Sequence, residues 1–454
     1  MDKHVLHFPT PALPAASRAH GLAACYGLLV LVIASIFSAL DRQILVLLAE
    51  PMRQGLGLSD TRLGLLQGVG ITLLAGALAV PFGWLADRYG RRTLLGICLL
   101  LWGAGTAACG LAHDFSTLFV GAIGLGIGES GVTPIVYGLI PEIVPERRRG
   151  LANGIYTLAA ILGAGLGMSL SGALVQALDD ARPLLPTALR TLELWRLAFL
   201  ATALAGPVLA LAVWLIRLHP GHRSDDAPQD TARPALRAYV SAHRRTMVSV
   251  FAGSGLLTMG IAAGANWAPI VAAREFGATP GEVGEGIGAA YLLGTLAGAV
   301  LGAAGVRLLR RRAGLATPVR VITVGATVAG LASVLMPAVP GVAGLYVLFG
   351  LQVAALIAGS VLVPTLLQDM TPAALRSRLI AIGTGVTLGL GALSPVLVGG
   401  LSDLMQGSAH GLLFAMAGVG ATAFLVSAAI MRTAEKPFLH TVDDIHPELA
   451  AKTA

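Results

Sequence analysis

Charged residues are scarce in this sequence. Asp, Glu, Lys and Arg make up 12% of the 454 residues, whereas soluble domains carry about a quarter. Hydrophobic residues make up 55%, and the mean hydropathy is +0.78. A soluble globular domain is therefore excluded, and the composition predicts an integral membrane protein.

Cysteine and the common catalytic motifs are also largely missing. The three cysteines, Cys25, Cys98 and Cys109, all lie in or beside apolar runs, which argues against a disulfide framework. The chain contains no P-loop, no H-E-x-x-H and no G-x-S-x-G, so ATP hydrolysis and common hydrolase chemistry have no support. We therefore expect no enzyme, no metal site and no resident cofactor.

Long apolar runs dominate what is present. They are continuous, so they predict helices instead of the alternating strands of a membrane barrel, and nearly all reach the ~20 residues that span the hydrocarbon. The predicted helices are residues 21–48, 62–86, 93–112, 116–139, 150–178, 195–218, 246–273, 285–309, 318–338, 342–367, 376–404 and 412–431. The fold class is thus an all-α membrane protein with twelve transmembrane helices.

The distribution of basic residues sets the orientation. If the loops alternate sides, one side carries 23 Lys and Arg and the other carries 6, and the richer side is cytoplasmic. Both termini are then cytoplasmic, and the net charge of +7 reports topology, so no nucleic-acid partner is expected. Arginine greatly outnumbers the three lysines, which hints at a bacterial source and hence the inner membrane.

The two halves of the chain are similar to each other. Residues 139–145, which contain Pro and Glu, align with 366–372, and Arg149 aligns with Arg376, at a constant offset of 227 (376 − 149). Such repeats build two six-helix bundles around a site near the membrane midplane. We assign residues 1–218 to the first bundle, 219–245 to a cytoplasmic linker with a surface helix near 234–245, and 246–454 to the second bundle and tail.

Three charged residues fall inside the predicted hydrocarbon zone: Asp41, Arg42 and Glu129. Each costs about 2.5 to 3.5 kcal/mol at the centre of a helix, and such residues usually mark function. Neighbours on a helix point about 100° apart, so we favour Arg42 and Glu129 on one water-filled cavity, with Asp41 at its edge or toward a neighbouring helix. The alternative is a structural ion pair that docks the first helix on the fourth.

The loop at residues 83–92 reads G-W-L-A-D-R-Y-G-R-R. This pattern resembles the loop between the second and third helices of the major facilitator superfamily. The resemblance implies that Asp87 faces the N-terminus of a helix in the other half, where the helix dipole favours a carboxylate. The alternative is a solvated basic loop without a gating role. We expect a gating latch from Gly83, Asp87, Arg88, Gly90, Arg91, Arg92 and Arg149.

Four stretches look like the spinster branch of that superfamily: residues 38–45, 58–68, the 83–92 loop and 126–131. This likeness implies proton-handling carboxylates at Asp41 and Glu129, and an arginine, Arg42, that meets an anionic headgroup. At position 122, where the branch usually has arginine, this chain has alanine. Ala122 therefore removes a cation expected two helical turns from Glu129.

These features together predict a secondary transporter, driven by a proton gradient, for an amphiphilic anion such as a lysophospholipid or sphingoid phosphate. We expect it to act as a monomer among membrane lipids. The alternatives are a uniporter, a carrier of small organic anions of the sugar-acid type, or a drug exporter; a receptor and an intramembrane enzyme are more distant ones. Polar or aromatic residues that could line the cavity are Thr133, Tyr137, Asn266, Trp267, Tyr291 and Gln352.

Overall fold

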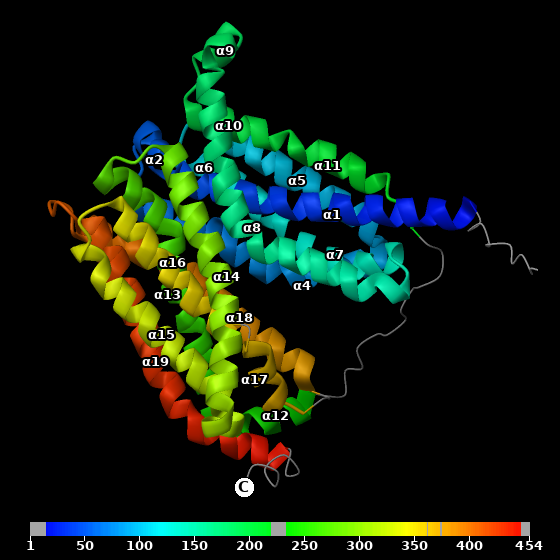
Figure 1. Ribbon diagram of the computed structural model, residues 1–454. Coiled ribbons are helices and arrows are strands. Elements are labelled where there is room, and N and C mark those ends of the chain that lie inside the picture. Colours follow the sequence, from blue (N-terminus) through cyan, green and yellow to red (C-terminus); the bar gives the residue numbers. More distant parts are fainter. Residues whose placement is uncertain (1–14, 219–232, 361, 373–374, 446–454) are drawn as a thin grey trace, which may run out of the picture.

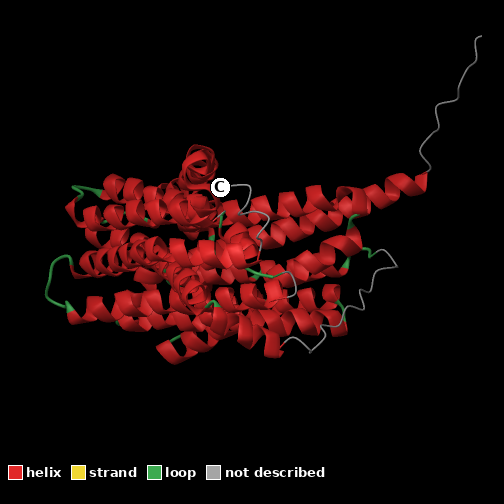
Figure 2. Cartoon of the chain, turned by 90° about the horizontal axis from the view of Figure 1, so that it is seen from below, coloured by secondary structure: helices red, strands yellow, loops and turns green. Residues whose placement is uncertain are grey.

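The computed structural model describes residues 15–218, 233–360, 362–372 and 375–445, all of which form helices or short connections (Figure 1). Figure 2 shows that the helices are arranged in long, roughly parallel rows. The elements of the first half are α1 (Ala15–Leu47), α2 (Ala49–Leu56), α3 (Asp60–Leu65), the π-helix η1 (Leu66–Leu73), α4 (Leu74–Tyr89), α5 (Arg91–Leu111), α6 (Phe115–Ser130), α7 (Val132–Ile143), α8 (Glu146–Asp180), η2 (Arg182–Leu184), α9 (Thr187–Arg190), α10 (Leu194–Ala203) and α11 (Ala205–Trp214).

The second half repeats this plan. Its elements are α12 (Arg233–Ala242), α13 (Arg244–Phe276), α14 (Pro280–Ala313), η4 (Gly314–Ala316), α15 (Thr317–Leu335), η5 (Met336–Ala338), α16 (Val342–Ser360), α17 (Val363–Asp369), α18 (Arg376–Leu404) and α19 (Gly411–Ile445). Eleven stretches of the described residues are long and apolar enough to cross a membrane, and the stretch 280–338 contains both α14 and α15. The described part of the chain therefore contains the twelve membrane helices that the sequence predicts.

Several helix boundaries differ from the predicted ones. The predicted fourth helix is two segments, α6 and α7, which meet at Gly131, and the predicted tenth helix is likewise divided into α16 and α17. The last helix runs to Ile445, beyond the predicted end at residue 431, because its extension buries Phe438 and Val442. Of the predicted linker, residues 219–232 lie outside the described part, and α12 is the expected surface helix.

Side-chain caps and glycines fix several helix ends. Asp114 accepts a hydrogen bond from the backbone N–H of Thr117 (2.8 Å) at the start of α6, and Thr279 begins α14 in a capping box with Glu282, which satisfies otherwise unpaired N–H groups. Gly90, with φ of +93°, makes the turn between α4 and α5, a conformation that side chains disfavour. These caps and this turn therefore fix where α4 ends and where α5, α6 and α14 begin.

The internal repeat is visible in matching hydrogen bonds. Arg149 donates from Nη2 to the carbonyl of Pro141 (3.2 Å), and Arg376 donates from Nη2 to the carbonyl of Gln368 (3.5 Å). Both donors and both acceptors are related by the offset of 227 residues (376 − 149 and 368 − 141). The two halves therefore share local structure as well as sequence.

Glycines bring the two bundles into backbone contact along two seams. A Cβ on Gly284 of α14 would lie 2.6 Å from the Cα of Gly172 on α8, and a Cβ on Gly68 of η1 would lie 2.1 Å from the carbonyl oxygen of Ala392 on α18. Close approach of this kind is how helices pack in lipid. The seams join α8 to α14 and the outer part of the second membrane helix to α18.

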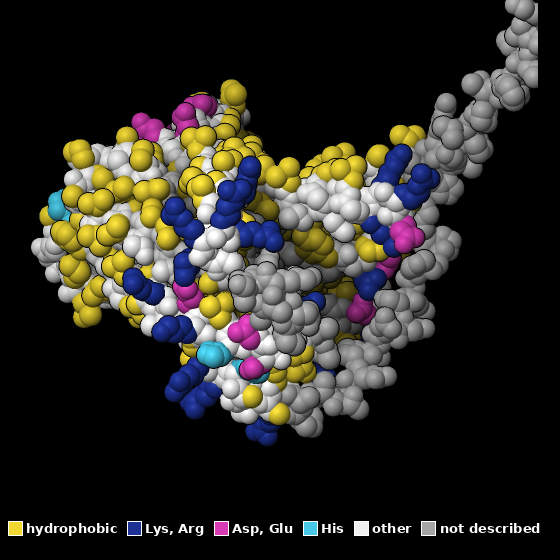
Figure 3. All heavy atoms as spheres, turned by 60° about the horizontal axis from the view of Figure 1, so that its bottom comes forward, with side chains coloured by type: hydrophobic (Ala, Val, Ile, Leu, Met, Phe, Trp, Pro, Cys, Tyr) yellow, Lys and Arg dark blue, Asp and Glu magenta, His cyan; other side chains and the backbone are white. Residues whose placement is uncertain are grey.

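The bundles separate toward the cytoplasm. Figure 1 shows α4 and α7 of the first bundle apart from α12 and α17 of the second bundle at that end. Near the cytoplasmic end of α4, a Cβ on Gly83 would meet no atom within 4 Å. Figure 3 shows Lys and Arg side chains gathered on the face that this view brings forward. The structure is therefore closed on the outer side and open toward the cytoplasm.

Candidate functional site

A cavity of about 580 Å³ lies between the first bundle and α18. Its walls come from α1, η1, α4, α6, α7 and one residue of α18. Small or apolar side chains make up most of the lining, and Arg42 and Glu129 are its charged members. The lining residues are Ser38, Arg42, Ile71, Thr72, Ala75, Gly76, Ala79, Val80, Gly83, Glu129, Ser130, Thr133, Pro134 and Leu388.

Arg42 and Glu129 form an ion pair in this cavity. The guanidinium donates to Glu129 Oε1 through Nε (3.0 Å) and also through Nη2, and Ser38 donates to the same oxygen from Oγ (2.9 Å). The Arg42 side chain is 58% exposed, whereas Glu129 is 7% exposed. The arginine can therefore meet a solute in the cavity, while the carboxylate that holds it is buried behind it.

Asp41 points away from the cavity, into the first bundle. Its carboxylate oxygen Oδ2 accepts hydrogen bonds from Trp102 Nε1 (2.7 Å) and Thr106 Oγ1 (2.8 Å), both on α5. Asp41 is only 1% exposed. Of the two positions that the sequence allowed, the structure shows the one toward a neighbouring helix.

Glu129 and Asp41 each keep one carboxylate oxygen without a partner among the described residues, Oε2 and Oδ1 respectively. A buried acceptor without a partner is costly. Each acid therefore has one oxygen that could take up a proton without first losing a hydrogen bond. In an ion pair whose oxygens are all hydrogen-bonded, protonation would have to break an existing bond.

The cytoplasmic loop of the first bundle does not form the predicted latch in this conformation. Asp87 accepts from Arg91 (2.6 Å), and Arg91 also pairs with Glu142 of α7 (2.6 Å), so these bonds stay within one bundle. Arg92 donates to the carbonyl of Ile216 (2.9 Å). The expected contact with the other half is absent from the described bonds of Asp87 because the bundles are apart at this end.

The other residues of the predicted latch also lie in the first bundle. Arg88 stands over the rings of Trp84 and Tyr89, at 5.6 and 5.7 Å from their centroids. A Cβ on Gly90, like one on Gly83, would have open space around it. The loop is thus held by its own bundle and has open space around both glycines.

The predicted cavity-lining residues divide into three groups. Thr133 lines the cavity. Tyr137, 41% exposed, shares a hydrogen bond with Thr157 (3.0 Å) beside it, and Tyr291 approaches Arg42 and Gln43 from the second bundle. These two stand near the site without being part of the cavity wall.

The structure does not place the other three residues in the wall of this cavity. Trp267 is fully buried, and Gln352 is buried and donates to Ser333 Oγ (2.7 Å), which ties α16 to α15. Asn266 donates to the carbonyl of Ala262 in its own helix (2.8 Å). Gln352 and Asn266 thus donate hydrogen bonds within the second bundle. From the sequence alone, an isolated polar residue in an apolar run could equally bond within its bundle or contact a substrate.

Ala122, the position that departs from the spinster pattern, is fully buried on α6. A Cβ on Gly70 of η1 would lie 3.5 Å from the Cβ of Ala122. The helices are close here, so an arginine at position 122 would need η1 to move away. The absence of this cation leaves Arg42 as the charged partner shown for Glu129.

A cluster of charges on the outer side joins the bundles, and it was not among the sites predicted from the sequence. Arg274 at the end of α13 pairs with Glu50 (2.7 Å) and Asp60 (2.8 Å) of the first bundle. Asp403 of α18 accepts from the backbone N–H of Thr61 (2.8 Å) and from its hydroxyl (2.6 Å). An acid of the second bundle thus caps the N-terminus of α3, and this outer cluster holds the outer side closed.

Electrostatics within the outer cluster can be seen at Glu50, which lies outside the membrane-spanning segments. Burial alone would raise its pKa, but hydrogen bonds from Arg53 and Arg274 outweigh burial, so the pKa is lowered. The carboxylate is therefore ionised and paired at neutral pH. No local pattern predicts this cluster, because Arg274 and Glu50 are 224 residues apart.

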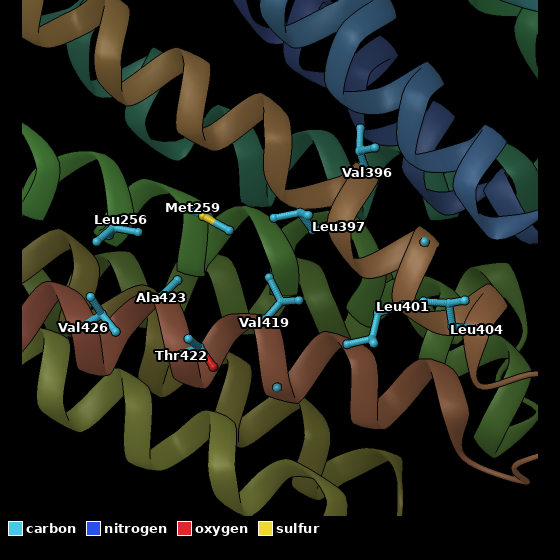
Figure 4. A pocket seen from close by; sticks show the side chains of 12 residues that line it. Leu256, Met259, Val396, Leu397, Leu401, Leu404, Val419, Thr422, Ala423 and Val426 are labelled. Carbon is cyan, nitrogen blue, oxygen red and sulfur yellow. The ribbon is translucent and has the colours of Figure 1, made fainter.

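A second cavity, of about 790 Å³, lies between α13, α18 and α19 (Figure 4). Its side chains are apolar apart from Thr422. The lining residues are Leu256, Met259, Val396, Leu397, Gly400, Leu401, Leu404, Gly418, Val419, Thr422, Ala423 and Val426. It offers no charged group to a polar solute, so the cavity with Arg42 and Glu129 is the candidate functional site.

Two six-helix bundles, closed outside and open inside around a charged cavity, define a membrane transporter. Comparison with known proteins gives the family: the sequence pattern of the Major Facilitator Superfamily matches residues 31–395, and the chain belongs to that superfamily. It is a multi-pass protein of the inner membrane.

Among its curated relatives is an MFS-type efflux pump of Mycolicibacterium smegmatis, 27% identical over 62% of each chain. A probable L-galactonate transporter of Escherichia coli is 27% identical over 43% of this chain and 40% of its own length. The mouse sphingosine-1-phosphate transporter SPNS2 is 29% identical over 33% of this chain and 28% of its own length. The chain thus matches less than two thirds of the length of each.

The fold is similar to the crystal structure of a bacterial homolog of the human lysosomal transporter Spinster, in an inward-facing and unoccupied conformation. The TM-score is 0.74 at 20% identity, over 93% of this chain and 98% of that one. Spinster proteins are therefore found among both the sequence relatives and the structural neighbours, which confirms the resemblance seen in the sequence.

Proposed function

We propose that the protein is a proton-coupled secondary transporter that binds the anionic group of an amphiphilic substrate at Arg42. The observation that carries this proposal is the Arg42–Glu129 ion pair, whose arginine is exposed to a cavity that opens toward the cytoplasm while its carboxylate is buried. An exposed cation held by a buried acid can exchange partners, because a proton on the acid removes the charge that holds it.

The cycle has three steps. A proton on Glu129 or Asp41 neutralises a buried charge, and a proton on Glu129 removes the negative charge that holds Arg42 and so frees the arginine for the anion. The bundles then rock about the cavity, which requires the outer cluster to separate and allows Asp87 to reach the second bundle. Loss of the proton on the other side returns Arg42 to Glu129 and displaces the substrate.

The lining supports an amphiphile. Apart from Arg42, Glu129 and a few hydroxyl groups, the cavity wall consists of Ala, Gly, Val, Ile, Leu and Pro side chains, which suit a hydrocarbon chain beside a charged headgroup. One relative is a sphingosine-1-phosphate transporter, a substrate that has both parts. Each chain contains a whole cavity, so we expect the monomer to be the functional unit.

A carrier of small organic anions is the second candidate. One relative is a probable L-galactonate transporter, and a carboxylate would meet the same arginine. A screen of lysophosphatidate, sphingosine-1-phosphate and L-galactonate for stabilisation of the purified protein separates the two, because a bound ligand raises the melting temperature by mass action. Stabilisation by L-galactonate alone would favour the second candidate.

Uptake of labelled lysophosphatidate into proteoliposomes under an imposed pH gradient tests the coupling. We expect Glu129→Gln and Asp41→Asn to abolish the response to the gradient. Glu435→Gln is the matched control, because Glu435 also pairs with an arginine, Arg320 (2.6 Å), but belongs to the second bundle outside the cavity lining. Unchanged coupling in both Glu129→Gln and Asp41→Asn would discard the proposal.

A further inference from the structure

Thr106 on α5 stands between two hydrogen-bond acceptors. Its Oγ1 lies 2.8 Å from Asp41 Oδ2 and 3.0 Å from the backbone carbonyl oxygen of Trp102. A threonine hydroxyl carries one hydrogen, so it donates to only one of these acceptors at a time. All three residues are buried, so the two arrangements exchange out of reach of bulk solvent.

The surroundings of Asp41 make this choice depend on its protonation state. The ionised carboxylate accepts from both Trp102 Nε1 and Thr106 Oγ1. The protonated acid must itself donate, and the indole N–H of Trp102 cannot accept. Thr106 Oγ1 is the acceptor within reach of Oδ2 among the bonds described for Asp41. The hydroxyl can accept there only if its own hydrogen turns to the carbonyl of Trp102.

We propose that Thr106 is a positioning residue for the proton step, a hydroxyl that rotates with the charge of Asp41 and keeps it hydrogen-bonded in both states. When a proton binds Oδ2, the bond from Thr106 to Oδ2 breaks, the bond from Thr106 to the Trp102 carbonyl forms, and the new carboxyl O–H donates to Thr106 Oγ1. One proton is gained and no other bond changes. This inference rests on the proposed proton coupling and assigns a residue to it.

Trp102 supplies the fixed half of the arrangement. A Cβ on Gly128 of α6 would lie 2.4 Å from the backbone nitrogen of Trp102, so α5 and α6 are in backbone contact at this point and the indole has little freedom. It donates to Oδ2 whether or not the acid is ionised. The moving part is thus the threonine hydroxyl alone.

Other ionisable groups near Asp41 are few. Glu129 faces it from α6 and Cys109 from α5, each close enough to interact electrostatically, and Arg42 is its neighbour on α1. Thr202 of α10 also lies beside the carboxylate, close enough for its hydroxyl to interact with Asp41. Its Oγ1 lies 3.1 Å from the carbonyl oxygens of Ala198 and Phe199, to only one of which it can donate at a time. A pH titration of Asp41 must therefore be read beside that of Glu129.

The test is infrared titration of the carboxyl C=O band of the full chain in liposomes, with Asp41→Asn used to assign the band. Thr106→Val removes the donor to the ionised form, which is the stronger bond. We expect the midpoint of Asp41 to move about one pH unit higher, a tenfold change in proton affinity. Thr106→Ser keeps the hydroxyl and should restore the wild-type midpoint.

Thr441→Val is the matched control. Thr441 is a buried threonine whose hydroxyl is also hydrogen-bonded, to Thr246 (2.8 Å) at the cytoplasmic end of the second bundle, and we expect it to leave the midpoint unchanged. A wild-type midpoint in Thr106→Val, or a band that never titrates, would overturn the inference. The titration needs no substrate, so it can fail or succeed independently of the transport assay that tests coupling.

Discussion

The outer cluster makes a quantitative prediction for Arg274→Ala. Arg274 donates two hydrogen bonds to Glu50 (2.7 and 3.1 Å) and two to Asp60 (both 2.8 Å). The two acids are each 6% exposed and the arginine is 24% exposed. Removing the arginine leaves two buried carboxylates without their cross-bundle cation whenever the outer side is closed, although Arg53 stays beside both acids and Ser402 still donates to Asp60.

Breaking a buried ion pair costs about 3 to 5 kcal/mol. Because Arg274 is partly solvated, we expect Arg274→Ala to destabilise the closed state by about 2 to 3 kcal/mol. When the outer side opens, water solvates the same acids, so this cost falls on the closed state alone. At 1.4 kcal/mol per factor of ten, the equilibrium should shift toward outward opening by about 30- to 150-fold.

Distances between spin labels at Ser116 and Ser408 measure this shift. Both residues are exposed, at the outer ends of the first and second bundles. The labels are placed in a variant without the native cysteines. We expect Arg274→Ala to populate a longer distance than the parent. Arg274→Lys should give an intermediate distribution, because lysine cannot bridge both acids bidentately. Arg320→Ala should give the same distribution as the parent. A distance distribution in Arg274→Ala that equals the parent's would refute the reasoning.

Three further predictions concern the same contacts. The lowered pKa of Glu50 stabilises the closed outer side at pH above the ordinary glutamate pKa of 4.5, and this stability is lost as pH falls through the lowered pKa. The distance between the labels should therefore lengthen only in that acid range, and lengthening near neutral pH would contradict the prediction. Gly68→Val should also lengthen the distance between the labels, because a Cβ at this position would lie 2.1 Å from the carbonyl oxygen of Ala392. An unchanged distance would contradict this prediction and show that η1 and α18 can move apart without opening the outer side. Ser38→Ala removes one hydrogen bond to Glu129 (2.9 Å), which is worth about 1 kcal/mol. The apparent substrate affinity should therefore change about fivefold while proton coupling persists. Loss of coupling would contradict this prediction and assign Ser38 a part in the proton step.

Much of the fold follows from composition and periodicity, because a membrane helix must be apolar along its length and cannot leave backbone groups unpaired. The helix ends are less predictable. The break at Gly131 and the division of the tenth helix depend on packing against neighbouring helices. A Gly or Pro in an apolar run does not by itself predict whether the helix ends there.

The candidate site was predictable where a single residue carries the signal. A charge in the hydrocarbon zone is expensive wherever its partner lies, so Arg42 and Glu129 stand out in the sequence alone. The outer cluster does not, because Glu50, Asp60 and Asp403 lie where charges are inexpensive and their partners are distant in sequence. The latch at Asp87 depends on the conformation, which the sequence does not specify.

The most direct test of the account measures proton movement and substrate movement in the same vesicles. An internal pH dye and labelled lysophosphatidate are followed together in proteoliposomes of the wild type and of Glu129→Gln. We expect the lumen to acidify as the substrate enters the wild-type vesicles, and we expect no acidification with the variant. Substrate entry without proton movement in the wild type, or the same acidification in Glu129→Gln, would contradict the claim that this buried acid and Arg42 couple the two.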